Sequence, residues 1–306
     1  MPTTPETNRA RHGRALLYTV ILLALFTVVQ SIFYLCGYEF ESDLYRHGPF
    51  SALTAAAWIA ATLGAILINL LLPQKTTCFE LKIRSTVWTE TASILSAAAL
   101  LATLALPVLS ISSGTDMLGN LLTSKETSDS TAKLMLIGSL IIAIPAAFHF
   151  IMSFAHHKAY PQSGAALLVW TAFAALRVYF DMRYLLTSPH RIMHLIALLS
   201  VLFFCIVELR QARGIASARV YGVGASLVIV IAGCDAICNL LLAAMGWFTL
   251  GSELSTYLFM LTIALYAAAR LHALATEQKE AAPIEATDSA DPAGSTEPAE
   301  EEEIDQ

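Results

Sequence analysis

The sequence predicts an all-α fold, a polytopic integral membrane bundle of eight transmembrane helices with both termini cytoplasmic. Of its 306 residues, 56% are hydrophobic and only 14% are charged, and the mean hydropathy is +0.63. The apolar residues gather in runs of about 20, the length of helix that crosses a hydrocarbon core about 30 Å thick. No run alternates apolar with polar residues as the strands of a membrane barrel do. Helices satisfy their own backbone hydrogen bonds, as lipid requires.

Each apolar run is assigned one membrane-spanning helix. The predicted spans are Ala15–Gly37, Phe50–Leu72, Val87–Ser110, Leu134–Ala155, Gly164–Leu186, Ile192–Leu209, Tyr221–Met245 and Leu254–Leu274. The first run follows three arginines and resembles the start of a secretion signal. Its uncharged stretch is longer than a signal core, and no small-residue cleavage site follows it. We therefore expect this helix to be retained.

The lysines and arginines predict the orientation of the bundle. If both termini lie inside, 12 of the 18 basic residues fall in inner segments and five in outer ones, while Arg177 lies within a span. Cytoplasmic loops carry the excess of basic residues in membrane proteins. We therefore expect a multi-pass protein of the cell membrane, plasma or inner, with an even number of spans.

The chain divides into three regions by composition. Residues 1–14 form a basic cytoplasmic N-terminus, residues 15–275 the eight-span domain, and residues 276–306 an acidic tail. The tail is too polar to bury a core, so we expect it to be disordered and cytoplasmic. It either solvates the protein or docks a protein partner. The net charge of −6 favours no nucleic-acid partner.

The eight spans also divide into two four-span halves, residues 15–158 and 159–275. Such halves would have the same orientation and could reflect a parallel duplication. Any eight-span chain can be halved in this way, so both interpretations stay open.

Five polar residues in the outer half of the predicted bundle form the candidate substrate-binding site. Arg177 and Asp181 lie four residues apart on one helical face, as do Asp235 and Asn239, and His194 lies about one turn into its span. Ionisable groups at membrane depth cost at least about 2.5–3.5 kcal/mol, so they usually face the bundle interior. We expect Arg177 to pair with Asp181 and Asp235, with Asn239 and His194 completing a pocket open to the outside. The rival interpretation is that the pair only joins two helices.

A second polar set lies in the inner half of the first four spans. It consists of Glu90, His149 and Asn69. Glu90 could accept a hydrogen bond from His149, and the set would then form a proton relay of the kind found in proton-coupled carriers. Alternatively, Glu90 lies at the headgroup level beside Trp88.

The sequence predicts no catalytic residue, metal site or cofactor. Cys234 and Cys238 share a helical face and could ligate a soft metal, but two core thiols are the commoner case. His190 and His194 have the spacing of a metal-binding pair without the further ligands that make a zinc motif specific. The hydrolase motifs His-Glu-x-x-His and Gly-x-Ser-x-Gly are absent, so an enzyme is not favoured.

The favoured function is therefore a carrier or binding protein for a small solute or ion, embedded in the lipid bilayer. The alternative is a non-transporting sensor, or an accessory or scaffold subunit, whose intramembrane charges are structural.

The sequence also predicts one close contact between helices. Gly222 and Ser226 form a small-xxx-small pair, which allows another helix to approach closely.

Overall fold

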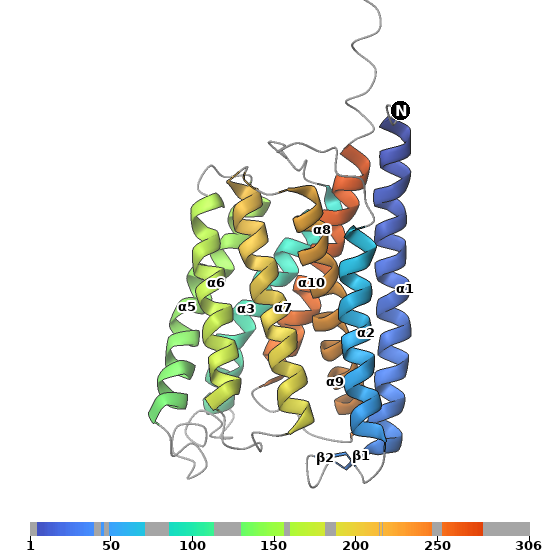
Figure 1. Ribbon diagram of the computed structural model, residues 1–306. Coiled ribbons are helices and arrows are strands. Elements are labelled where there is room, and N and C mark those ends of the chain that lie inside the picture. Colours follow the sequence, from blue (N-terminus) through green and yellow to red (C-terminus); the bar gives the residue numbers. More distant parts are fainter. Residues whose placement is uncertain are drawn as a thin grey trace, which may run out of the picture.

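We describe a computed structural model of the chain. The structure describes residues 5–39, 44–45, 49–70, 86–112, 130–155, 160–180, 188–213, 215, 217–246 and 253–277. Almost all of these residues are helical, and the helices run side by side along one common direction (Figure 1).

The elements follow one another as up-and-down helices with one short hairpin. They are α1 (Pro5–Gly37), β1 (Tyr38–Glu39), β2 (Leu44–Tyr45), α2 (Phe50–Leu70), α3 (Val87–Ser112), α5 (Ser130–Phe154), α6 (Tyr160–Phe180), α7 (Pro189–Ala212), α8 (Ala218–Leu227), the π-helix η2 (Val228–Ala232), α9 (Gly233–Ala244) and α10 (Leu254–Glu277). The segments α8, η2 and α9 form one continuous span. Within the described residues, eight helices are long and apolar enough to cross a membrane, which confirms the all-α bundle and fits a multi-pass membrane protein.

The two ends of the bundle differ. α1 begins and α10 ends at the same end, which we call the N-terminal end, and the strands β1 and β2 lie at the opposite, hairpin end (Figure 1). An even number of passes produces this arrangement. The strands pair antiparallel, Tyr38 with Tyr45 and Glu39 with Leu44.

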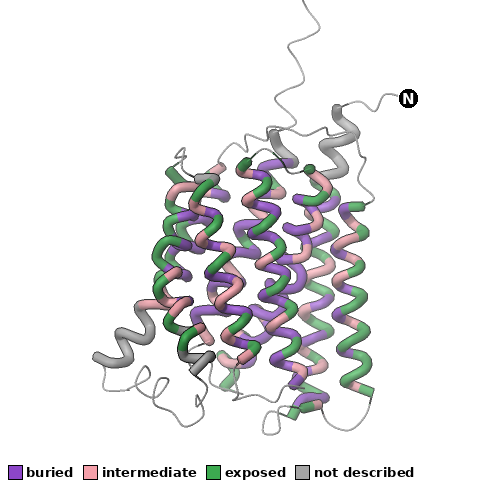
Figure 2. The backbone as a smooth tube through the Cα atoms, turned by 60° about the vertical axis from the view of Figure 1, so that its left-hand side comes forward, coloured by how far each residue is buried: buried purple, intermediate pink, exposed green. Residues whose placement is uncertain are grey.

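Apolar side chains cover the outside of the bundle as well as its core. Large exposed residues include Leu25, Ile59, Ile141 and Leu199, each about half exposed or more. Figure 2 shows the exposed positions along the outward faces of the helices and the buried positions turned toward their neighbours. A soluble monomer rarely exposes so large an apolar surface, whereas hydrocarbon solvates it.

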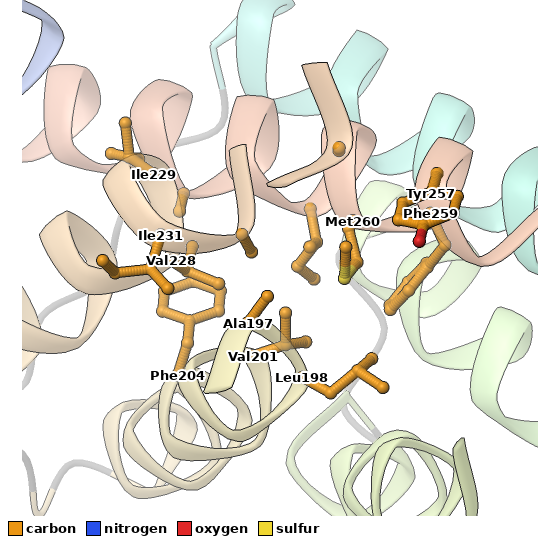
Figure 3. Close-up of a cluster of buried hydrophobic side chains, with 14 of the residues drawn as sticks. Ala197, Leu198, Val201, Phe204, Val228, Ile229, Ile231, Tyr257, Phe259 and Met260 are labelled. Atoms are coloured by element: carbon orange, nitrogen blue, oxygen red, sulfur yellow. The ribbon is translucent and has the colours of Figure 1, made fainter. Parts of the chain in front are cut away.

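The continuous span of α8, η2 and α9 is the most deeply buried of the eight. It lies among α1, α2, α7 and α10. Its π-helical residues pack against α7 and α10 in the core, where Val201, Phe204, Ile231 and Met260 meet (Figure 3). This apolar layer separates the polar groups near the hairpin end from those near the N-terminal end.

The structure differs from the prediction at the start of α7, in the π-helix and in the two strands. α7 begins at Pro189, capped by Ser188, so His190 and Arg191 lie inside the helix rather than before it. The π-helix was not predicted, because hydrophobic periodicity does not distinguish a single π-helical turn from α-helix. The two-residue strands were not predicted either.

The proposed halves of the chain are interleaved in space. α5 packs along α6, and α1 and α2 pack against the span of α8, η2 and α9. Duplication therefore stays a prediction. The expected N-terminal region is helical from Pro5, α10 continues to Glu277, and residues 278–306 of the expected acidic tail lie outside the described residues.

Candidate functional site

His194, Asp235 and Asn239 form one hydrogen-bonded set toward the hairpin end of the bundle. The Nδ1 atom of His194, on α7, lies 2.8 Å from Oδ2 of Asp235, on α9. The amide of Asn239 donates to the other carboxylate oxygen at 3.0 Å and to the Asp235 backbone carbonyl at 2.8 Å. An ionised carboxylate only accepts hydrogen bonds, so with Asp235 ionised the hydrogen of this contact belongs to Nδ1 of His194. All three side chains are buried.

Aromatic rings enclose the imidazole of His194. The ring of Tyr257, on α10, lies 4.7 Å from it between centroids. The His190 ring, one turn away on α7, is parallel to it at 6.5 Å, and the hydroxyl of Tyr257 lies 3.2 Å from Nε2 of His190. α7, α9 and α10 therefore build the site together.

Two buried polar atoms of this set have no hydrogen-bond partner in the structure. They are Nε2 of His194 and Oδ1 of Asn239. A buried polar atom left unpaired costs about 1–3 kcal/mol, and most such atoms in proteins are paired. With Nδ1 protonated, both are acceptors, so the open positions suit a hydrogen-bond donor or a cation.

The π-helix sets the direction in which Asp235 faces. Ser226, before it, points toward α1 and α2, where its hydroxyl lies 3.1 Å from Thr19 Oγ1 and accepts from Asn69 at 2.7 Å. Asp235, after it, points toward α7. A π-helical turn adds one residue to an α-helix and changes the relative direction of the residues on its two sides, and such turns are frequent at functional sites.

The predicted pairing of Arg177 with Asp235 stays a prediction, and the structure shows other contacts for both residues. Nη2 of Arg177, on α6, donates to Thr256 Oγ1 on α10 at 2.9 Å, and the ion-pair partner of Asp235 within the described residues is His194. Asp181 lies outside the described residues, so its predicted pairing with Arg177 stays a prediction. The sequence could not show which neighbouring helix the side chain of Arg177 meets.

The second predicted set is distributed over separate contacts. His149, on α5, lies 3.0 Å from the hydroxyl of Ser163 on α6. Asn69 bonds to Ser226 and to the carbonyl of Ala65, and Glu90 is half-buried in the first turn of α3. Asn69 therefore bonds to neither of the others, and a relay through all three stays a prediction.

A buried charged network near the N-terminal end was missed by the sequence analysis. Glu208, on α7, accepts from Tyr221 of α8 at 2.7 Å, from Tyr266 of α10 at 2.9 Å and from Arg270 of α10 at 2.6 Å. Glu208 lies at the end of the predicted span Ile192–Leu209, and Arg270 lies near the end of the predicted span Leu254–Leu274. Both positions resemble headgroup-level residues in sequence, although both side chains are buried.

Two thiols lie on the other side of Asp235, toward α1. Cys234 and Cys238 are buried with their sulfur atoms 3.9 Å apart, and the Cys238 sulfur lies 3.6 Å from Ser31 Oγ. Within the described part of the chain, three or more His, Cys, Asp or Glu side chains never gather as they would around a metal ion.

Tyrosines cover the hairpin end above the site. The rings of Tyr34, Tyr38 and Tyr45 meet edge to face in series, each pair 5.3 Å apart. Burial raises the pKa of Tyr45, which lies outside the membrane-spanning helices. Tyr45 therefore stays neutral at physiological pH and can remain packed against the bundle.

Comparisons with protein-family models, curated proteins and solved structures found no match to this chain. The functional argument therefore rests on the site itself.

Proposed function

We propose that the chain is a membrane carrier or binding protein for a small solute or ion, with His194, Asp235 and Asn239 at its binding site. One observation carries this proposal: two adjoining members of a buried polar set each leave an acceptor atom unpaired. Buried polar side chains whose only role was to join helices would be expected to use all their hydrogen-bonding atoms on one another. A ligand that donates hydrogen bonds would satisfy them here.

The position of the site supports entry from the hairpin end, which the distribution of basic residues assigns to the outside. Fourteen residues separate His194 from Glu208 on α7, which corresponds to about 21 Å of helix. Apolar side chains from α7, η2 and α10 fill this interval (Figure 3). The network of Glu208 then closes the N-terminal end, so passage through the protein requires this packing to rearrange.

The rival function is a sensor or accessory subunit whose buried charges only hold helices together. The network of Glu208 fits a structural role, since its carboxylate accepts hydrogen bonds from three side chains on α8 and α10. The His194 set leaves two acceptor atoms open, Nε2 of His194 and Oδ1 of Asn239.

The experiment uses proteoliposomes on a solid-supported membrane, exposed in turn to sodium, potassium, choline, glycine, succinate and an acid step. We expect at least one probe to evoke a current that Asn239→Ala removes. The matched control is Asn69→Ala, which removes a buried amide near the other end of the bundle. Each variant removes one buried carboxamide. A current that is lost in both variants would therefore reflect impaired folding and not the loss of a binding site. Silence with every probe, or an equal current in Asn239→Ala, would replace this proposal with the accessory-subunit function.

A further inference from the structure

We infer that the ion taken by this site is a proton, bound at Nε2 of His194 while Asp235 stays ionised. The inference deepens the proposed function and rests on it, because it concerns the same residues.

The set is one positive charge short of neutrality. With a neutral His194 it carries the single negative charge of Asp235, and the amide of Asn239 adds none. A lone charge in a low-dielectric interior is unfavourable, and an opposite charge in contact relieves it. A proton on His194 turns the contact with Asp235 into an ion pair of zero net charge.

In the part of the chain that the structure describes, the ion-pair partner of Asp235 is His194. The titratable groups beside the pair are His190 of α7, Tyr257 of α10, Tyr34 of α1 and the two cysteines Cys234 and Cys238 of α9. Two arginines lie on the adjoining helices, Arg177 on α6 and Arg191 on α7. Arg177 donates to Thr256. Arg191 donates to the Tyr179 carbonyl and lies 6.0 Å from that ring. Both guanidinium groups are thus held against other partners.

A proton also suits the ligands and the space. His194 and Asp235 are two ligands with no third His, Cys, Asp or Glu gathered around them in the described chain, fewer than a metal site requires. All three side chains are buried against neighbouring helices. The tilted ring of Tyr257, 4.7 Å away between centroids, is close enough for its π electrons to favour a charged imidazole.

The step itself is a simple proton transfer. A hydronium ion at the hairpin end is the donor: one of its O–H bonds breaks, the lone pair of His194 Nε2 forms an N–H bond with the released proton, and a water molecule is left. The hydrogen on Nδ1 stays between His194 and Asp235. His194 then changes from a hydrogen-bond acceptor to a donor at Nε2. A second ligand at this atom would therefore have to supply a hydrogen-bond acceptor instead of a donor.

The test is nitrogen NMR on full-length protein labelled with ¹⁵N-histidine in lipid nanodiscs. Signals of His194 are assigned by their loss in His194→Asn and their retention in His272→Asn, which removes an exposed histidine of α10. Between about pH 5 and 8, the range in which imidazoles act as switches, we expect His194 to gain a proton on Nε2 while Nδ1 stays protonated. In Asp235→Asn the Nδ1 signature of a hydrogen bond to a carboxylate should disappear. A His194 ring that keeps one proton throughout this range would overturn the inference.

Proton movement in vesicles separates this inference from the proposed function. Proteoliposomes loaded with a pH-sensitive dye should acidify after an external acid step, and His194→Asn should lower the rate to that of protein-free vesicles while His272→Asn does not. Titration of His194 without any flux would support the proton site and contradict a carrier. Flux that survives in His194→Asn would contradict the proton site and leave a carrier in place.

Discussion

The imidazole of His194 and the carboxylate of Asp235 lie 2.8 Å apart, 41 residues apart in the sequence and on two different helices. Both side chains are buried, and the contact leaves the second ring nitrogen of His194 open. A carboxylate on one imidazole nitrogen fixes the tautomer and makes the other nitrogen a better base. This relationship is the basis of the functional proposal.

The His194–Asp235 contact should be measurable as a coupling energy. We expect His194→Leu and Asp235→Leu each to lower the free energy of unfolding, by about 3–5 kcal/mol where the remaining partner stays charged. The double variant should cost less than the sum of the two, because it leaves no unpaired charge. Reversible unfolding in mixed micelles measures this. Additive losses would show that the two side chains do not interact.

The network of Glu208 should contribute to stability at the N-terminal end. Glu208→Gln removes the charge that Arg270 faces at 2.6 Å, so we expect a loss of about 3–5 kcal/mol. Adding Arg270→Met should recover part of that loss. Glu90→Gln, at a half-buried carboxylate on α3, is the control and should change the unfolding free energy little. A Glu208→Gln protein as stable as the control would contradict the network.

Gly222 should be sensitive to the smallest added side chain. A Cβ there would lie 2.4 Å from Oδ1 of Asn69 and so displace the amide that donates to Ser226. We expect Gly222→Ala to cost about 1–3 kcal/mol in unfolding free energy. Gly233→Ala, in the same span, is the control because its nearest contact is an ordinary 3.4 Å. Equal stability of the two variants would mean that α2 and α8 are not so close.

Thiol labelling should report whether the site opens toward the hairpin end. Cys36 is exposed, whereas Cys234 and Cys238 are buried beside Asp235. In a background with Cys78→Ser, a membrane-impermeant thiol reagent added outside should modify Cys36 readily and the buried pair about tenfold or more slowly, since reactivity follows exposure. Acidification should change the rate at Cys234, because the proposed proton site lies beside this thiol. Complete protection of Cys234 and Cys238 at every pH would favour the accessory-subunit function.

The hydrophobic pattern was enough to predict the eight helices. Each apolar run is long enough to cross a bilayer, and a helix satisfies the backbone hydrogen bonds of such a run within the run itself. The pattern also predicted the close approach at Gly222 and Ser226, which the contact of Asn69 with Ser226 confirms. Both features depend on residues near one another in sequence.

The partners of the polar residues were harder to predict. Spacing shows that Asp235 and Asn239 share a helical face, and their hydrogen bond confirms it. Spacing does not show which helix that face meets, and the π-helix before Asp235 alters its direction without any sequence signal. In the structure Asp235 meets His194. Glu208 and Arg270 were missed for a different reason, since their depth in the bundle depends on where α7 and α10 end.

The central claim is that Asp235 serves a binding site and does not merely join helices. Its most direct test is the current evoked by an acid step in proteoliposomes containing Asp235→Asn, with Glu39→Gln as an exposed carboxylate control at the hairpin end. We predict that Asp235→Asn, which keeps a side chain of the same size, melts within a few degrees of the unaltered protein yet carries no current, while the control carries the full current. A full current in Asp235→Asn, or one that falls only as far as the folded fraction falls, would contradict the account.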